Sequence, residues 1–193
     1  MANLIIKSSA DNLVLQGSDA SPAITIGATG TTTFAENATF SATVTQPAKP
    51  SFKALRGAEN SASTSGAVII FTDVTTGQNR SWNIGSHYST STGKFTAPVA
   101  GIYHFGFQCY TNSAGTLKWY TTIYNETQAQ IIVREMHQTN SGMSQDSTWM
   151  TSGLAKLSAS DVVYCRQDSG ADRIVYGATG NTGTSFFEGC LIG

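Results

Sequence analysis

Residues 93–105 read Gly-Lys-Phe-Thr-Ala-Pro-Val-Ala-Gly-Ile-Tyr-His-Phe, and this stretch carries the strongest structural signal in the sequence. The segment that begins at Gly101 continues to Thr111 and alternates between two kinds of side chain. One set consists of Tyr103, Phe105, Phe107 and Cys109, and the other consists of Ile102, His104, Gly106, Gln108 and Tyr110. Successive side chains of a strand point to opposite faces of a sheet, so the pattern predicts a strand with its aromatic face in the core.

The second face of this segment is partly apolar. Ile102 and Tyr110 share it with uncharged polar groups, including His104. A surface that mixes apolar and neutral polar residues is typical of a contact between subunits. We therefore expect Ile102, His104 and Tyr110 to lie at a subunit interface.

Similar strand-like segments recur through the rest of the chain after residue 50, with turn residues between them. They are 50–56, 67–74, 80–85, 93–99, 117–125, 129–138, 147–157, 161–167, 173–177 and 184–192. Almost nothing in this region has the period of a helix, so the pattern predicts an all-β sandwich or barrel.

The opening stretch resembles the signature of the C1q/TNF-like jelly-roll family, in which Phe-Thr-x-Pro turns through Gly into Gly-x-Tyr-x-Phe. Two further motifs follow in the family's order: Leu-Ala-Lys-Leu at 154–157 with Ser-Asp-Val at 160–162, and Ser-Phe-Phe-Glu-Gly-Cys-Leu-Ile at 185–192. Ser160 stands where the family usually has glycine. The resemblance covers residues 50–193 and implies a ten-stranded sandwich that forms homotrimers. It adds Met150 and Phe187 as candidates for the trimer axis, with the sandwich core as their alternative place.

The first part of the chain repeats shorter units. They are NLIIK at 3, NLVLQ at 12, AITIG at 23, TTTF at 31 and ATFSATV at 38. Such strands cannot fill a core of their own. Either three copies wrap around one another, or the strands extend the sheet edge of a partner protein. Prolines at 47 and 50 interrupt the pattern, which predicts an extended β-strand arm at 1–49 and a jelly-roll domain at 50–193.

Composition narrows the possible partners. Charged residues make up 12% of the chain, the formal net charge is −1, and Lys and Arg form no cluster. Nucleic acid and membrane insertion are therefore not expected. The start of the sequence lacks a signal-peptide pattern, which predicts a soluble protein made in the cytoplasm. Cys109, Cys165 and Cys190 are odd in number, so at least one is expected to be unpaired, and free thiols are the simplest expectation.

Catalytic and metal-binding motifs are weak. His87, His104 and His137 come without a nucleophile motif, and the carboxylates select no catalytic pair, so we expect no enzymatic activity and no cofactor. Asp168 and Asp172 flank a short loop that could offer oxygen ligands to calcium. An ordinary turn rich in Asp is the alternative.

These features favour a trimeric virion protein made in a host cytoplasm. The Asn-Leu-x-Leu and Pro-Ala-Ile-Thr-Ile segments resemble the start of many phage fibre and head-decoration proteins. The first hypothesis is a capsid decoration, cement or head-fibre protein whose residues 1–45 bind the major capsid protein or another virion protein. The second is a receptor-binding tail-fibre tip in which Tyr88 and Trp119 stack on a host-surface glycan. A secreted lectin or cytokine would call for a signal peptide and often a collagen-like stalk, and the sequence shows neither.

Overall fold

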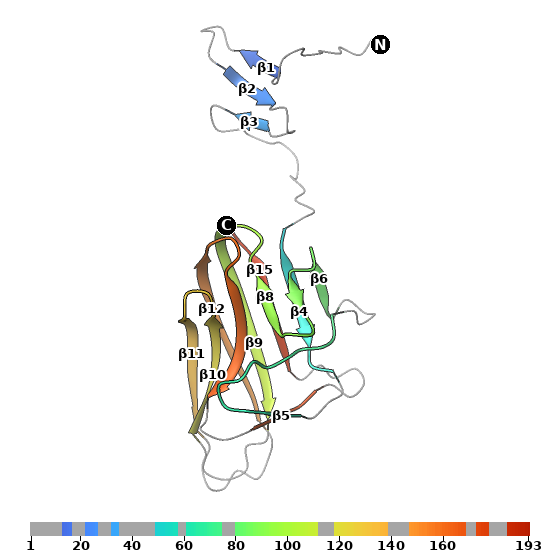
Figure 1. Ribbon diagram of the computed structural model, residues 1–193, viewed down its shortest axis with the longest axis vertical. Helices are drawn as coiled ribbons and strands as arrows, with labels where there is room; N and C mark the ends of the chain where they lie inside the picture. The colour runs from blue at the N-terminus through green and yellow to red at the C-terminus, as the bar shows by residue number, and fades with distance from the viewer. Residues whose placement is uncertain are drawn as a thin grey trace. The chain divides into compact units, whose positions relative to one another are not determined.

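The computed structural model describes residues 13–16, 22–26, 32–34, 49–57, 61–74, 80–111, 118–138, 147–168, 173–177 and 185–193. The chain divides into two compact units, Met1–Gln46 and Pro47–Gly193. Across the described ranges every regular element is a β-strand, which confirms the predicted fold class (Figure 1). In the same ranges there is no helix long and apolar enough to cross a membrane.

The first unit contains a small antiparallel sheet in the order β1-β2-β3 (Figure 1). Its strands are β1 (Leu13–Gln16), β2 (Pro22–Ile26) and β3 (Thr32–Phe34). They coincide with three of the predicted short segments, at 12, 23 and 31. The predicted segments at 3 and 38 lie outside the described residues.

The second unit is a sandwich of two antiparallel sheets. The five-stranded sheet has the order β11-β10-β13-β8-β7, and the seven-stranded sheet has the order β5-β14-β9-β15-β4-β6 with β12 also paired to β9. Their strands are β4 (Ser51–Leu55), β5 (Ser61–Ser63), β6 (Trp82–Ile84), β7 (Tyr88–Ser89), β8 (Lys94–Thr96), β9 (Gly101–Thr111), β10 (Lys118–Asn125), β11 (Gln130–Gln138), β12 (Ser147–Leu157), β13 (Val162–Asp168), β14 (Arg173–Val175) and β15 (Phe186–Leu191). Without the short strands β5 and β14, the described strands form two sheets of five, which is the predicted ten-stranded jelly roll.

The space between the sheets is filled mainly by aromatic side chains. Tyr103, Phe105, Phe107 and Cys109 of β9 are each 0% exposed, so the predicted core face of this strand is confirmed. Phe52 of β4 stacks on Phe95 of β8 with ring centroids 5.0 Å apart, which joins the two sheets. Offset and edge-on ring pairs of this kind add about 0.5–1.5 kcal/mol each beyond the burial of their area. The aromatic core therefore holds β9 in place and fixes which of its faces remains outside.

Residues 67–74 differ from the predicted strand. They make a single bridge to each sheet, Val68 with Arg166 and Asp73 with Leu55. Two backbone hydrogen bonds join Asp73 and Leu55, at 2.7 and 3.0 Å. The segment crosses from one sheet to the other, so it has no continuous neighbour to pair with. Its apolar alternation serves to bury Ile69 and Phe71 in the core on the way.

The turn before β13 is organised by a buried carboxylate. Asp161 is 3% exposed, and its Oδ2 accepts hydrogen bonds from Ser158 N at 2.9 Å and Gln128 Nε2 at 2.6 Å. Asn125 Nδ2 donates to the same oxygen at 3.3 Å. Ser160 has a φ of 72°, the left-handed conformation that a glycine adopts without strain. Asp161 thus ties the β12–β13 turn to the β10–β11 turn at one end of the sandwich.

Candidate subunit interface

The outer face of the seven-stranded sheet is the face turned away from the core. The register between strands shows which residues lie on it. Ile102 of β9 is paired with Lys156 of β12. His104 is paired with Leu154 on one side and with Cys190 of β15 on the other. Directly opposed residues of antiparallel strands lie on the same face. These five residues therefore form one continuous surface across three strands.

The same surface continues across the remaining strands of the sheet. Lys53 of β4 is paired with Glu188 of β15 and with Trp82 of β6, and Ser51 is paired with Ile84. The outer face thus spans β12, β9, β15, β4 and β6.

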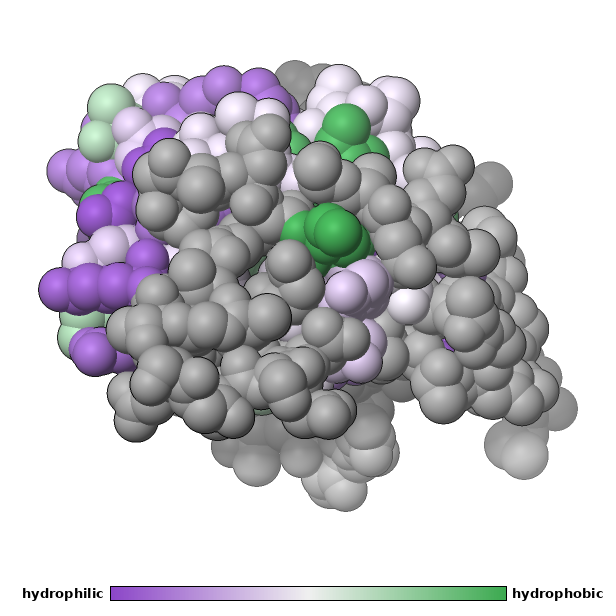
Figure 2. Space-filling model, turned by 90° about the horizontal axis from the view of Figure 1, so that it is seen from below, coloured by the Kyte–Doolittle hydropathy of each residue, from purple (hydrophilic) through white to green (hydrophobic). Residues whose placement is uncertain are grey.

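Five large apolar side chains of this face are exposed to solvent. We call them the outer-face patch: Ile102 at 44%, Met150 at 51%, Leu154 at 60%, Trp82 at 38% and Ile84 at 44%. Clustered apolar exposure on one sheet face is a mark of an interaction surface. Seen from below, the described residues show hydrophobic side chains only in small, separate groups (Figure 2).

Lys53 and Glu188 neutralise each other within this face. Lys53 Nζ lies 3.0 Å from Glu188 Oε2 and 3.9 Å from the ring centroid of Phe186. Glu188 lies against Gly106, where an added Cβ would be only 3.0 Å from Oε1. Burying an ion pair that is already formed is far less costly than burying a single charge. A partner could therefore cover this part of the face.

A hollow of about 220 Å³ opens on the same face. It is lined by Ser51, Phe52, Trp82, His104, Glu188, Gly189 and Cys190. Among these, Phe52 is 1% exposed and belongs to the core, whereas Trp82 is 38% exposed. The hollow has the size of one large apolar side chain, so it suits a projecting residue of a partner.

The candidate interface residues from the sequence fall in two groups. Ile102 and Met150 are exposed on the outer face, and His104 lies partly buried between them and the hollow. Tyr110 is also partly buried, because its ring packs 4.9 Å from that of Tyr176 near the end of β9. Their role in a contact between subunits stays a prediction.

Phe187 occupies its alternative place, the sandwich core. It is 0% exposed and is paired with Phe107 and Ala54, two other buried residues. This corrects its assignment as an interface residue, since a partner could not reach it without opening the sandwich. The neighbouring Phe186 and Glu188 belong to the outer face instead. Two adjacent phenylalanines leave the facing of a strand ambiguous in sequence, and the register of β15 decides it.

Three residues of the outer-face patch are not among the predicted interface residues. Leu154 lies within a family motif, and its alternation with Met150 along 147–157 is a sufficient signal for its place on the outer face. Trp82 and Ile84 belong to a three-residue strand at the sheet edge, too short to show an alternation. The register of β6 with β4 was needed to place them.

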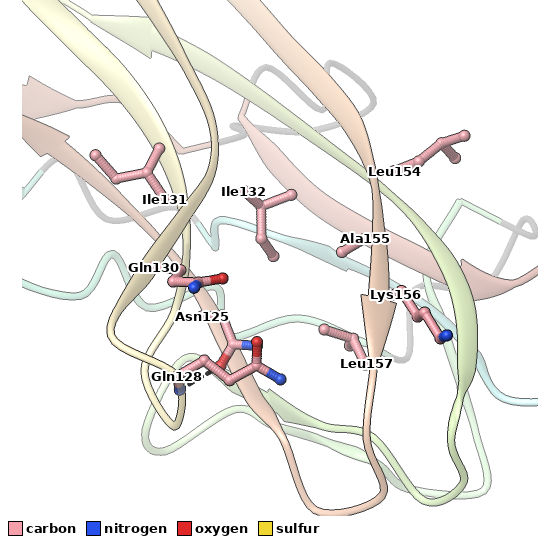
Figure 3. A pocket seen from close by; sticks show the side chains of 9 residues that line it. All are labelled: Asn125, Gln128, Gln130, Ile131, Ile132, Leu154, Ala155, Lys156 and Leu157. Atoms are coloured by element: carbon pink, nitrogen blue, oxygen red, sulfur yellow. Dashed lines mark hydrogen bonds between the residues drawn. The ribbon is translucent and has the colours of Figure 1, made fainter.

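A second hollow, of about 170 Å³, lies between the edge strands β11 and β12 (Figure 3). Figure 3 shows Ile132, Ala155 and Leu157 directed into this space, while Leu154 and Lys156 leave β12 on the other side. Asn125, Gln128 and Gln130 also line it, so the hollow is polar as well as apolar. Leu154 also lines this hollow and belongs to the outer-face patch. The hollow therefore adjoins that patch at the edge of the sandwich.

His137 lies inside the sandwich. His137 is 6% exposed, and its Nε2 lies 2.7 Å from the hydroxyl of Thr121, which also contacts the hydroxyl of Thr151. Its ring lies 5.0 Å from that of Trp119 and 4.5 Å from that of Trp149. Burial lowers the pKa of His137 from 6.5 to about 4. The ring is therefore neutral at pH 7 and serves packing.

The two aromatic residues proposed to stack on a glycan are not available for that role. Tyr88 is 3% exposed, and its hydroxyl both donates to the Phe71 carbonyl and accepts from the Phe71 N–H, each at 3.1 Å. Trp119 is 1% exposed, inside the sandwich. Burial raises the pKa of Tyr88 well above its usual range. Tyr88 in β7 and Trp119 in β10 lie on the inner faces of their strands and belong to the core.

Of the two possible calcium ligands, the structure describes Asp168 but not Asp172. Asp168 Oδ2 lies 2.7 Å from Arg134 Nη2 and accepts from the Thr122 hydroxyl at 2.8 Å. Arg166 Nε lies 3.2 Å from Asp168 Oδ1. These cationic groups compete with a metal ion for the carboxylate. Asp172 lies outside the described residues, within which no group of three or more His, Cys, Asp or Glu is gathered. The expectation of no cofactor stays a prediction, with calcium at Asp168 and Asp172 as its alternative.

The three cysteines are free thiols. Cys109 and Cys165 are buried, and burial raises the pKa of Cys109 to about 12 and that of Cys165 well above its ordinary value. A thiol held in its protonated form is a poor nucleophile. Cys190 is partly buried beside His104 on the outer face.

Comparison with known proteins agrees with this architecture. Residues 51–192 match the model of the C1q domain. The globular domain of zebrafish complement 1qA is 23% identical, with a TM-score of 0.56, covering 75% of this chain and 98% of that one. The Eiger TNF of S. frugiperda is 13% identical, with a TM-score of 0.54, covering 75% of this chain and 92% of that one. No curated protein matches the chain.

The family match, residues 51–192, covers most of the chain and nearly all of its second unit, Pro47–Gly193. C1q/TNF domains typically form homotrimers and are generally non-enzymatic. The chain therefore belongs to the C1q domain family.

Proposed function

We propose that this chain forms a homotrimer through the outer-face patch. The observation that carries the proposal is the exposure of Ile102, Met150 and Leu154 on two adjacent strands of one sheet. In a closed ring of three copies, two different surfaces of each copy meet. The sheet face with its hollow would receive the β11–β12 edge of the next copy, and Leu154 lies where these two surfaces join.

We further propose that the trimer is a non-enzymatic structural protein of a bacteriophage virion, namely a capsid decoration, cement or head-fibre protein made in the host cytoplasm. Support comes from a separate N-terminal unit of short strands ahead of a C1q domain. Residues 1–45 would bind the major capsid protein or another virion protein. Three arms on one trimer make attachment multivalent, so modest contacts by each arm yield a long-lived bond.

Deletion of residues 1–45 tests this role. The shortened chain should remain a folded trimer by sedimentation and circular dichroism, yet no longer co-sediment with particles that lack the protein. The intact chain is the control and should co-sediment. Binding of the shortened chain at the level of the intact chain would overturn the proposed role of the arm.

A receptor-binding tail-fibre tip is the second candidate function. One observation favours it: Tyr120 and Tyr124 lie on the outer face of the five-stranded sheet, each against a guanidinium. The Arg166 guanidinium carbon is 4.2 Å from the ring centroid of Tyr124, and that of Arg134 is 5.3 Å from Tyr120. Tyr and Arg together are common at binding hot spots. Saturable adsorption of the isolated trimer to host cells would favour this role, and imaging of copies over the whole capsid would favour the first.

A further inference from the structure

The outer face of the five-stranded sheet carries two arginines that share one carboxylate. Arg134 of β11 and Arg166 of β13 are both paired with Thr122 of β10, and we call these three residues the arginine row. Arg134 Nη2 lies 2.7 Å from Asp168 Oδ2, and Arg166 Nε lies 3.2 Å from Asp168 Oδ1. One carboxylate balances only one of the two guanidinium charges, and both arginines stay charged at any ordinary pH. The cluster therefore keeps a net positive charge in a chain whose formal net charge is −1.

Both guanidiniums are already oriented within the folded chain. The Thr122 hydroxyl accepts a hydrogen bond from Arg134 Nε at 3.2 Å and donates one to Asp168 at 2.8 Å. The side chain of Arg134 is 35% exposed, and that of Arg166 is 18% exposed. A planar guanidinium that is held in place loses little conformational entropy when it binds a carboxylate. The arginine row is thus prepared to receive an anionic group from solvent.

Apolar side chains lie on both sides of the arginine row. Tyr120 of β10 is paired with Met136 of β11, and Tyr124 is paired with Ile131. Met136 is 54% exposed, and Ile131 is 45% exposed. Neighbouring rows are two residues apart along β10, which corresponds to about 7 Å. Along the strand direction the face therefore presents apolar, cationic and apolar groups in turn.

An extended segment of polypeptide has the matching period. Its alternate side chains point the same way and also repeat at about 7 Å. An acidic side chain between two apolar ones would meet the arginine row, with its apolar neighbours against Met136 and Ile131. Arginine suits this role because its planar fork forms strong, directional hydrogen bonds with a carboxylate. The spacing and the charge of the face thus describe one kind of partner.

A glycan is a poorer match for this face. Stacking of a sugar ring needs an open aromatic face. A guanidinium carbon lies 5.3 Å from the ring centroid of Tyr120 and another lies 4.2 Å from that of Tyr124. The ring of Tyr124 also lies 5.5 Å from that of Tyr164, which is only 7% exposed. The accessible groups are aliphatic side chains and a guanidinium, and these suit the side chains of a protein.

We propose that the outer face of the five-stranded sheet binds an extended segment of another protein with the pattern apolar-x-acidic-x-apolar, whose carboxylate pairs with Arg134 and Arg166. In the receptor-binding role proposed above, on which this inference rests, the receptor is then a protein. Asp168 is the internal occupant of the arginine pair, so the carboxylate of the partner competes with it for the guanidiniums.

Capture of the intact chain on a peptide-coated surface, measured by biolayer interferometry, tests this pairing. The probe is the peptide Leu-Thr-Glu-Thr-Leu with blocked ends, and the control peptide has Gln in place of Glu. The acidic peptide should bind at least about tenfold more tightly, because only its carboxylate can form charge-assisted hydrogen bonds as an anion. Equal binding of the two peptides, or binding of neither, would overturn the inference.

Substitutions within the chain locate the binding. Asp168→Asn removes the competing internal charge and should increase the affinity for the acidic peptide at least about threefold, a gain that misfolding cannot produce. Arg134→Gln should lower the affinity at least about fivefold. Arg80→Gln is the matched control, since it removes the same charge from the segment before β6 of the other sheet, and it should change the affinity less than about twofold. Equal losses in the two arginine variants, or no gain in a folded Asp168→Asn protein, would overturn the site.

Two further outcomes distinguish the acidic partner from the receptor-binding role. Adsorption to host cells that the acidic peptide does not compete would overturn the inference and leave that role standing. Peptide binding by a protein that does not adsorb to host cells would overturn the role and support the acidic partner. Tighter capture on alginate, a polymer of uronic acids, with the same loss in Arg134→Gln, would overturn the choice of a protein in favour of an acidic glycan.

Discussion

The ring of Phe187 meets the ring of Phe52 edge-on, with centroids 4.9 Å apart and planes at 74°. The two residues belong to the adjacent strands β15 and β4, and both are buried. Phe187 also lies 5.9 Å from Phe105 of β9 in a nearly parallel arrangement. One side chain thus links three strands of the seven-stranded sheet from the core side.

Phe187→Ala should lower the free energy of unfolding by about 3–5 kcal/mol, because it removes a fully enclosed ring and leaves a cavity. Urea unfolding at one fixed protein concentration measures the change. Phe186→Ala is the matched control on the outer face and should cost less than about 1.5 kcal/mol. Equal losses at the two positions would contradict the inward placement of Phe187.

Asp161→Ala should destabilise the fold by about 2–4 kcal/mol, because the donors on Ser158, Gln128 and Asn125 lose their shared acceptor. Equilibrium unfolding gives the value. Glu126→Gln, which weakens the exposed pair with Lys94, should change the stability by less than about 1 kcal/mol. A small effect at Asp161 would show that the two turns at this end fold independently of its carboxylate.

The stability of the fold should decrease as the pH falls from about 6.5 to about 4, because of His137. Burial lowers its pKa to about 4 in the folded chain, whereas the unfolded chain binds the proton near pH 6.5. Between these values the unfolded state holds more protons, so acid favours it. The contribution is complete above pH 6.5 and lost below pH 4.

His137→Gln should remove this dependence. The measurement is the difference in unfolding free energy between wild type and variant at several pH values, so that the carboxylates common to both proteins cancel. The groups in contact with the ring, Thr121, Trp119 and Trp149, do not titrate in this range. A difference that stays constant from pH 7 to pH 4 would refute the assignment to His137.

Leu154→Asp should dissociate the trimer without unfolding the sandwich, since Leu154 is 60% exposed and contributes to no core contact that the substitution must break. Placing a carboxylate in an apolar interface should raise the trimer dissociation constant at least about 100-fold. Sedimentation equilibrium measures this constant, and circular dichroism checks the fold. Thr96→Asp adds the same charge to the outer face of the other sheet and should leave assembly unchanged. A trimeric Leu154→Asp protein would exclude this face as the interface.

The long strands were predictable because their alternation is strict. The segments 101–111 and 147–157 match β9 and β12 to the residue. Short strands were less predictable. β5 contains three residues and β7 contains two, which is too few to show an alternation. Residues 67–74 alternate like a strand yet pair at only two points, because a segment that crosses between sheets buries alternate side chains without a neighbour beside it.

The interface was partly predictable for the same reason. Alternation places Ile102 on the outer face of β9 without knowledge of any other strand. The hollow between Trp82, His104 and Cys190 could not be found this way, because its residues come from β6, β9 and β15, which are distant in sequence. Their meeting depends on strand order, and strand order depends on long-range pairing that local pattern does not encode.

The fold class and the family resemblance could be read from the sequence, since both rest on local alternation and on motifs within a few residues of each other. Tertiary structure decided which of two adjacent phenylalanines enters the core, and it turned Tyr88 and Trp119 away from solvent. In each case the deciding quantity is the register between strands, which fixes the face of every residue and is set by partners far away in the chain.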